Sequence, residues 1–244
     1  MHLSRRWYHF TPLLAGAMLA TPFLAMAHTP QQKPPDDCDW TFDGSDRKWV
    51  KLRTVQQEQN YTKLGSEAAP LTLDQLYDTV KSFNDRVPQN LRTVPRSRPM
   101  PQIETVRVTV RAFLLGAKFE RDGDKDFHAE IGATLDWNTR HFIIEVPPGQ
   151  AYCDARKATW ELIKQDRLAN GQSPQTDRHI MNQPVEVLVT GYVFLDAFHG
   201  RTSNSRQFHE ISGGRGLRKP GGGSKVKGIW EIHPVTQLKK WEGN

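Results

Sequence analysis

The chain has little cysteine and little apolar sequence for its length. Only two cysteines, Cys38 and Cys153, occur among 244 residues, and the hydrophobic fraction is 37%. Soluble domains usually carry about 45–50% apolar residues, so we expect a modest core. The 18 glycines and 16 prolines indicate much irregular chain. After residue 27, no stretch has the roughly 20 uninterrupted apolar residues that a membrane-spanning helix needs, so we expect no such helix there.

Motifs of common enzyme classes are missing as well. The sequence has no G-x-S-x-G nucleophile elbow, the turn that exposes the reactive serine of α/β-hydrolases. The run Gly-Gly-Gly-Ser-Lys at 221–225 lacks the flanking strand and helix and the spacing of a Walker loop. Both cysteines are better explained as a disulfide than as nucleophiles. Nucleophilic catalysis is therefore unsupported, and the sequence leaves open whether the protein is an enzyme.

Residues 1–27 have the three parts of a secretory signal peptide. Arg5 and Arg6 form a basic start, an apolar segment follows over 13–26, and Ala25-Met26-Ala27 provides small residues around a cleavage site. This pattern predicts export to a secreted or periplasmic location. The two arginines also resemble the start of a twin-arginine signal, so the export route stays open. No cysteine follows the apolar segment at the place where a lipid anchor would be attached.

The chain beyond this segment is mildly basic and has one expected crosslink. Without residues 1–27 it carries 31 basic and 27 acidic residues, a net charge of +4, which selects no partner by itself. Two cysteines in an exported protein are expected to pair, so we predict a Cys38–Cys153 disulfide. Two unpaired buried thiols are the alternative. The bond would close a loop of more than 100 residues and contribute about 4–5 kcal/mol in the chain-entropy model.

An N-terminal arm, residues 28–102, contains one clear helix and a basic segment. Thr72 and Gln75 have the spacing of a capping box. Apolar residues then recur at helical spacing, which predicts a core-facing helix over 72–84. Four arginines are interspersed with four prolines over 86–102, which predicts an extended and solvated linker.

A long hairpin is predicted at 106–131. Apolar and polar residues alternate from 106 to 112, as in a strand with one buried face. The Asp122-Gly123 pair predicts a two-residue turn, because both residues tolerate a positive φ. In the second strand His128 and Glu130 should face outward, opposite the apolar side chains that alternate with them.

The rest of the chain supplies three more strands and one helix. We expect strands at 141–146, 185–198 and 228–238, and a helix over 151–169 that ends at Asn170-Gly171. The order strand, strand, strand, helix, strand, strand is that of the OB-fold, a five-stranded Greek-key barrel. Gly116 and Gly191 fall inside strands, where a barrel needs bends. We therefore predict a mainly β, OB-fold-like barrel over 103–240; an open antiparallel sheet with one packed helix is the alternative.

Short motifs along this domain resemble a group of secreted bacterial proteins of unassigned function. They are Asp124-Lys125-Asp126-Phe127-His128, Ile144-Glu145-Val146-Pro147, Cys153, the segment 189–196 with His199-Gly200, and Trp230-Glu231-Ile232-His233-Pro234-Val235. The resemblance covers about residues 103–238. The helix at 72–84 and the long loop at 200–227 are additions to it. It implies a shared fold more than a known activity.

Four side chains on the expected outer face of the barrel form a candidate metal site. They are His128, Glu145, Glu231 and His233, and the i, i+2 spacing of the last two places them on one face of a strand. Imidazole and carboxylate ligands together suit zinc or another divalent first-row ion. Simple His–Glu pairing across the sheet is the structural alternative. The alternating aspartates at 122, 124 and 126 are a calcium candidate, although the remaining ligands of an EF-hand loop are missing.

The loop at 200–227 is rich in glycine and in basic residues. In OB-folds the loop between strands four and five flanks the ligand face. Basic residues on flexible chain can follow a phosphate or uronate backbone. Phe208 is the only aromatic residue of this loop, and a solvated insertion is the alternative. The basic residues are Arg201, Arg206, Arg215, Arg218, Lys219, Lys225 and Lys227.

Two functions from different classes are consistent with these patterns. The first is an exported, non-enzymatic OB-fold-like module that binds an anionic polymer, either nucleic acid or an acidic glycan, or a partner protein. The second is a metal-dependent hydrolase, for example a nuclease, that uses the four His and Glu side chains. A divalent metal is the one cofactor indicated, and the sequence does not indicate an oligomeric state.

Overall fold

A computed structural model shows a mainly β protein. It describes residues 34–43, 47–53, 61–88, 90–173, 177–197, 216–219 and 225–243. The strands are β1 (Thr62–Leu64), β2 (Leu71–Thr72), β3 (Val106–Phe119), β4 (Phe127–Gly132), β5 (His141–Val146), β6 (Arg178–Leu195) and β7 (Val226–Lys240). The helices are α1 (Lys48–Lys51), α2 (Leu73–Ser82) and α3 (Cys153–Ala169), with 3₁₀ turns η2 (Asn84–Arg86), η3 (Leu91–Thr93) and η4 (Gln150–Tyr152). Among the described helices, none has the length and apolarity needed to cross a membrane.

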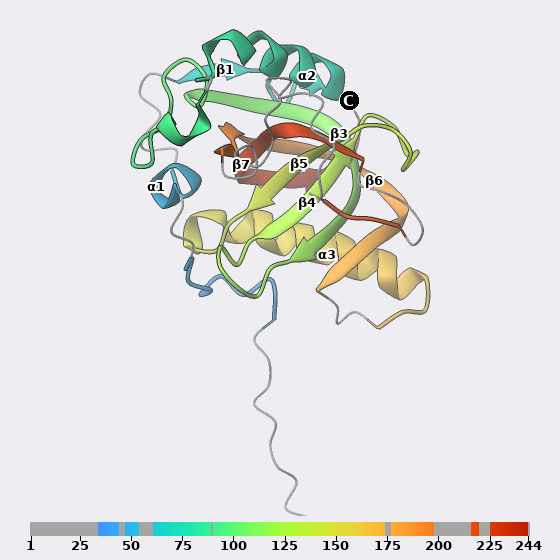
Figure 1. Cartoon of the computed structure of the whole chain (residues 1–244). Coiled ribbons are helices and arrows are strands. Elements are labelled where there is room, and N and C mark those ends of the chain that lie inside the picture. The colour runs from blue at the N-terminus through green and yellow to red at the C-terminus, as the bar shows by residue number, and fades with distance from the viewer. Residues whose placement is uncertain are drawn as a thin grey trace, which may run out of the picture. The chain divides into compact units, whose positions relative to one another are not determined.

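Five of the strands close into a barrel. β3 pairs with β4, β4 with β5, β5 with β7 and β7 with β6, and β6 returns to pair with β3. All of these pairs are antiparallel except β5 with β7, which is parallel. α3 connects β5 to β6 (Figure 1), so the predicted helix between the third and fourth barrel strands is confirmed. β1 and β2 pair in parallel with the first half of β3 and are not part of the closed ring.

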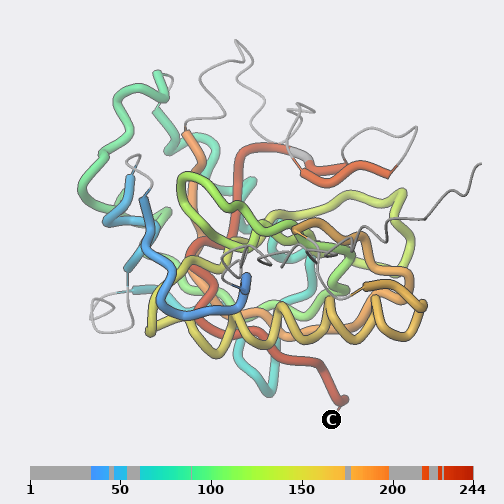
Figure 2. The backbone as a smooth tube through the Cα atoms, turned by 90° about the horizontal axis from the view of Figure 1, so that it is seen from below, coloured from blue at the N-terminus to red at the C-terminus, as the bar shows by residue number. Residues whose placement is uncertain are grey.

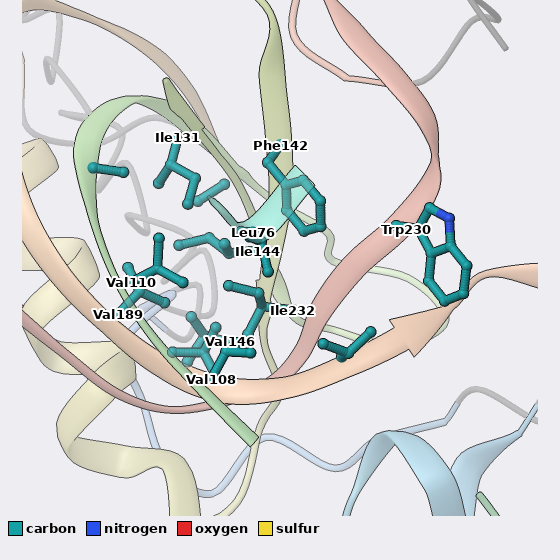
Figure 3. Close-up of a cluster of buried hydrophobic side chains, with 14 of the residues drawn as sticks. Leu76, Val108, Val110, Ile131, Phe142, Ile144, Val146, Val189, Trp230 and Ile232 are labelled. Atoms are coloured by element: carbon teal, nitrogen blue, oxygen red, sulfur yellow. The ribbon is translucent and has the colours of Figure 1, made fainter. Parts of the chain in front are cut away.

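The inside of the barrel is filled by apolar side chains. Val108, Ile144 and Val189 converge there from three different strands (Figure 3). α2 and α3 lie at opposite ends of the barrel (Figure 1), and each adds buried side chains, such as Leu76 and Ile163, to the same core. The helices therefore keep water from the ends of the barrel, and the sheet keeps it from the sides.

Local sequence signals place the helix ends and the strand bends. Thr72 and Gln75 form both hydrogen bonds of the capping box at the start of α2. Gly171 follows the end of α3 with a φ of +67°, which glycine adopts without steric strain. The ladders shift register beside both predicted bend glycines. At Gly191 a Cβ would lie 2.5 Å from the carbonyl oxygen of Pro234, so the close approach of β6 and β7 requires glycine.

The chain departs from the sequence-based expectations at three places. Phe119 already pairs with Phe127, so residues 120–126 form a longer connection and the predicted two-residue turn is wrong. The segment 86–102 is not a fully solvated linker, because it forms η3 and buries apolar side chains at 87, 91, 94 and 100. Its arginines are exposed as expected. β6 begins at Arg178 rather than at the predicted residue 185. The prediction began too late because the polar residues before 185 do not show the alternation of a strand.

The N-terminal arm is bound to the barrel by a disulfide and by a buried arginine. Cys38 pairs with Cys153, the first residue of α3, across 115 positions, which confirms the predicted crosslink. Figure 2 shows the start of the described chain running beside α3. Arg156, one turn further along α3, donates to the carbonyl oxygens of Pro35, Lys125 and Val146. One guanidinium group thus joins the arm, the β3–β4 connection and the end of β5.

Candidate metal centre

The predicted metal ligands point outward from three neighbouring strands. His128 on β4 is directly opposite Glu145 on β5. β5 pairs in parallel with β7, and Ile143 is opposite Glu231 there. The alternate residues Glu145 and His233 therefore lie level with each other, one step further along both strands. The barrel closure thus joins side chains that are far apart in the sequence.

These four side chains form one continuous chain of contacts. Nδ1 of His128 lies 3.1 Å from Oε1 of Glu145, and Nδ1 of His233 lies 2.6 Å from the second oxygen of the same carboxylate. Oε2 of Glu231 is 3.7 Å from that His233 nitrogen. All four residues are buried, with Glu145 the most exposed at 8%. They face outward as expected, but other parts of the chain cover them.

Asp126, which the sequence marked only as a calcium candidate, completes the cluster. One potential ligand atom from each of Asp126, Glu145 and His233 lies within 4.8 Å of the other two. Oδ1 of Asp126, Nε2 of His128 and both ring nitrogens of His233 have no hydrogen-bond partner in the described chain. The short contact from His233 to Glu145 is thus not an aligned hydrogen bond. Each unsatisfied buried polar atom costs about 1–3 kcal/mol, so a bound cation would be stabilising here.

Burial and neighbouring charges set the protonation states of the three candidate ligands. Burial lowers the pKa of His233, so its ring is neutral and keeps a lone pair for a metal. Burial, followed by repulsion from Glu145, raises the pKa of Asp126 well above its usual range. Asp126 therefore holds a proton that a metal would displace.

Glu145 behaves in the opposite way. Burial alone would raise its pKa, but attraction to His233, a hydrogen bond from His128 and the charge of Lys51 hold the pKa well below its usual range. The attraction between Glu145 and His233 requires a positively charged imidazole ring, and the burial of His233 disfavours that charge. The hydrogen bond from His128 and the Lys51 charge keep the Glu145 carboxylate ionised without it.

α1 covers the cluster and brings a positive charge to it. Lys51 forms an ion pair with Asp124, and the two side chains are 14% and 20% exposed. Burial would lower the pKa of Lys51, but Glu145, Asp124 and Asp126 outweigh it and raise that pKa above its usual value. The ammonium group therefore stays charged at the one edge of the cluster that approaches the surface.

Two further residues of the arm fix α1 to the barrel. Arg47 makes a bidentate ion pair with Glu104, with both oxygens at 2.5 Å. Glu104 also accepts two backbone N–H groups. Arg53 donates to the carbonyl oxygens of Glu104, Val193 and His233, so the arm contacts the backbone of a candidate ligand. Burial lowers the pKa of Arg53 to about 10, which leaves it charged at neutral pH.

Carboxylates outnumber basic side chains in this covered layer. The acidic members are Glu104, Asp124, Asp126, Glu145 and Glu231, and the basic members are Arg47, Lys51, Arg53 and Arg156. These nine side chains together carry one excess negative charge when every carboxylate among them is ionised. Such a layer can be neutralised by protonating Asp126 or by taking up a cation.

Two other carboxylate–histidine pairs on the same fold are fully satisfied. Glu130 accepts from Nδ1 of His141 at 2.6 Å and from the backbone N–H of Leu217, while Nε2 of His141 donates to a carbonyl oxygen. Asp166 on α3 accepts from Nε2 of His179 at 2.7 Å and from two backbone N–H groups. Neither pair leaves a nitrogen or an oxygen for a metal, so both have a structural role.

The structure describes only part of the predicted basic loop. Arg201, Arg206 and Arg215 lie outside the described residues, as do Phe208 and the His199-Gly200 pair, and the side chain of Lys227 is not described. Arg218 and Lys219 are exposed, and Lys219 Nζ lies 5.3 Å from the ring centre of Trp137. Lys225 is half-buried, and its carbonyl oxygen accepts the N–H of His141.

The sequence indicated four members of the cluster as metal ligands, marked Asp126 only as a calcium candidate and did not indicate Lys51. No sequence motif indicated Lys51, because its position beside the cluster depends on where the arm packs against the barrel. Asp126 had a signal, since it stands two residues before His128. Comparison of this chain with protein-family models, curated proteins and solved structures finds no match.

Proposed function

We propose that this protein is an exported, OB-fold-like binding module that holds a divalent first-row metal ion between its barrel and its N-terminal arm. The order of the barrel strands, with a helix between the third and fourth, supports the OB-fold assignment. The three-part pattern of residues 1–27 and a disulfide, a bond typical of oxidising compartments, support export. The resemblance to secreted bacterial proteins is in line with both.

One observation carries the metal proposal. Asp126, Glu145 and His233 converge, and buried ligand atoms of two of them have no other partner. Imidazole nitrogen with carboxylate oxygen is the ligand set of zinc and its neighbours. Both cysteines are in the disulfide, so a thiolate site for a softer metal is not available.

The burial of the cluster favours metal binding over metal catalysis. A catalytic zinc keeps one coordination position open to water or substrate, whereas a structural zinc is enclosed by protein ligands. Here His233 is 0% and Asp126 is 1% exposed, and Lys51 with its ion-pair partner lies at the edge. The hydrolase hypothesis would require α1 to move away from the site, so it is the less supported of the two.

The metal content of purified, disulfide-intact protein tests the proposal. After loading with zinc and exhaustive dialysis, we expect about one equivalent of bound metal per chain, because the three candidate ligands converge on a single position. Asp126→Asn and His233→Gln should lose the bound zinc. His179→Gln is the matched control, because it removes a buried histidine from a satisfied pair and should keep the metal. Wild-type protein without bound zinc, or zinc retained by both site variants, would refute the proposal.

Lys51 provides a second test of the same site. If a metal is the physiological cation, Lys51→Met removes a competing positive charge, and the protein should bind zinc more tightly. If Lys51 is itself the permanent partner of the carboxylates, the same variant should lose stability and show no gain in zinc affinity.

A second candidate function is the binding of an anionic polymer near residues 216–219. Its observation is that Arg218 and Lys219 are both exposed and that Lys219 lies beside the ring of Trp137. Binding of DNA or an acidic glycan should then weaken with added salt, because bound counterions are released from the polymer. Arg218→Gln with Lys219→Gln should reduce affinity and the salt dependence. Deleting the whole loop is a poor test, since Leu217 is fully buried.

A further inference from the structure

The segment 86–102 holds a row of arginines at the surface of the protein. Arg92, Arg96 and Arg98, here called the arginine row, are exposed. Four neighbouring apolar side chains are buried in the main core: Val87, Leu91, Val94 and Met100. The 3₁₀ turn η3 and four prolines restrict the backbone of the segment further. The arginines are therefore carried by a fixed stretch of chain, and little backbone freedom is lost when they bind a partner.

The arginine row has no counter-ion among the residues that the structure describes. None of its three side chains forms an ion pair or donates a hydrogen bond there. No aspartate or glutamate occurs between Arg86 and Ile103. The next acidic residue, Glu104, is buried and pairs with Arg47. On the other side Asp85 is exposed next to Arg86, which we do not count in the row. The row therefore carries positive charge that the protein itself does not neutralise.

An exposed tryptophan lies on the neighbouring helix α1. Trp49 is 70% exposed, and no other Phe, Tyr or Trp side chain in the described ranges is exposed. Arg47, two residues before Trp49, donates from Nε to the carbonyl oxygen of Pro95 at 2.9 Å. Figures 1 and 2 both show α1 beside the segment 86–102. The indole ring and the arginine row therefore belong to one part of the surface.

One indole ring beside several guanidinium groups matches the chemistry of a membrane surface. Tryptophan is enriched at the level of the lipid headgroups, and clusters of cations bind anionic lipids. Guanidinium groups pair with phosphate oxygens through two parallel hydrogen bonds. Proteins that bind single-stranded nucleic acid stack successive bases on several aromatic rings, and specific protein interfaces have an apolar centre. A single exposed ring provides neither of these features, so the membrane is the favoured partner.

We propose that Trp49 and the arginine row form a docking surface for membranes that contain anionic phospholipids. The guanidinium groups of the row bind lipid phosphates, and the indole ring lies at the level of the headgroups. The surface shares no side chain with the candidate metal centre. Membrane docking therefore does not depend on a bound metal ion, and each can be tested without the other.

Sedimentation of disulfide-intact protein with lipid vesicles tests this proposal. We expect binding to vesicles of phosphatidylcholine mixed with phosphatidylglycerol, and much weaker binding to phosphatidylcholine alone. Added salt should weaken the binding, because it screens exposed charges. A variant with Arg92→Gln, Arg96→Gln and Arg98→Gln should bind about a hundredfold more weakly, at about fivefold for each cation near an anionic surface. Trp49→Ala should weaken the binding at low and at high salt, because the contribution of the ring is not ionic.

A charge-matched variant is the control for the loss of three cations. Lys157→Gln, Lys219→Gln and Lys240→Gln together remove three exposed lysines from other parts of the chain. This variant has the same net charge as the arginine variant and should bind anionic vesicles nearly as well as the wild type. All the substituted side chains are exposed, so we expect both variants to fold, and thermal unfolding checks this. An equal loss of binding in both variants would overturn the proposal.

Two further measurements examine the contact and the kind of partner. Vesicles with brominated lipids should quench part of the tryptophan fluorescence of the wild type, and Trp49→Phe should remove that quenching. Single-stranded DNA serves as a soluble polyanion. Binding of DNA that depends on the arginine row, without binding to anionic vesicles at low salt, would overturn the choice of a membrane. Absence of vesicle binding by the wild type would overturn the proposal whether or not zinc binds to the protein.

Discussion

The Asp166–His179 pair and the Asp126–Glu145–His233 cluster are both buried, yet they differ in how their polar atoms are satisfied. Asp166 accepts from His179, from the backbone and side chain of Asn182 and from the backbone of Gln183. Burial alone would raise the pKa of Asp166, but these hydrogen bonds outweigh it and lower that pKa. In the second cluster burial prevails, and the pKa of Asp126 is raised.

The histidines of the two groups differ in the same way. Arg167 donates toward Nδ1 of His179 at 3.4 Å, so that nitrogen accepts and Nε2 carries the hydrogen given to Asp166. Both nitrogens of His179 are therefore engaged. His233 has neither nitrogen in an aligned hydrogen bond. A buried histidine beside a carboxylate therefore indicates a ligand site only where ring nitrogens or carboxylate oxygens lack a hydrogen-bond partner.

The largest effect should come from detaching the arm, since the arm covers the candidate metal centre and not the Asp166–His179 pair. Replacing both cysteines, Cys38→Ser with Cys153→Ser, should lower the free energy of unfolding by about 4–5 kcal/mol, from the loop length and the chain-entropy model. Denaturant unfolding measures this loss. Hydrogen exchange should show faster opening of residues 47–53 than of α3. Equal acceleration in both regions would contradict the assigned role of the arm.

The next largest loss of stability is expected from substitutions of two glutamates on the neighbouring strands β4 and β5. Glu130→Gln removes one partner of a satisfied buried pair and should cost roughly 3–5 kcal/mol, with or without zinc. Glu145→Gln also removes the repulsion with Asp126, so in metal-free protein its cost should be smaller. Thermal unfolding with and without zinc measures both. Wild-type protein should be stabilised by zinc, as ligand linkage requires, and Glu145→Gln should not; a zinc shift in Glu145→Gln would contradict the ligand assignment.

A smaller effect is expected from Asp166 and depends on pH. Because the folded pKa of Asp166 is lowered, its carboxylate stabilises the protein above the unfolded value of about 3.9. This stabilisation is lost as the pH falls through the folded pKa. Asp166→Asn should cost about 1–3 kcal/mol at neutral pH and flatten the acid side of the stability curve. An unchanged slope below pH 4, measured by urea unfolding, would show that Asp166 is not ionised in the folded protein.

The smallest effect comes from two adjacent isoleucines on β5. Ile144 packs in the barrel core, and Ile143 faces the outer layer; both are 0% exposed. Ile144→Val should cost about 0.5–1.5 kcal/mol, and Ile143→Val should cost less, because its neighbours outside the barrel are largely polar. A larger loss from Ile143→Val, measured by chemical denaturation, would mean that the outer layer is packed as tightly as the core.

The barrel was predictable because its signals are local. Alternating valines, the capping box at Thr72 and Gln75, and the glycine after α3 define elements without reference to the rest of the chain. The inward and outward faces of β4 and β5 were predictable for the same reason, and this parity selected His128 and Glu145. The cysteine pair was predictable from number alone, since a chain with two cysteines has only one possible internal pairing.

The sequence did not predict that residues 47–53 of the N-terminal arm cover the outer face of β4, β5 and β7. It depends on Arg47 reaching Glu104 and on Lys51 reaching Asp124, and no periodicity in the sequence connects these pairs. The prediction of a solvated linker over residues 86–102 was wrong for a related reason: the buried valines Val87 and Val94 stand among prolines and arginines and form no regular apolar pattern. The convergence of Glu145 with His233 required knowing that β5 and β7 are neighbours, which follows from the closed barrel and not from either strand.

The most direct test of the account is an anomalous diffraction map at the zinc absorption edge, from crystals of disulfide-intact protein grown with zinc. We predict one strong peak within about 2.0–2.2 Å of ligand atoms from Asp126, Glu145 and His233, the usual range for zinc bound to nitrogen and oxygen. Well-ordered density for these three side chains without a peak between them, and with Lys51 as the cation at the carboxylates, would contradict it.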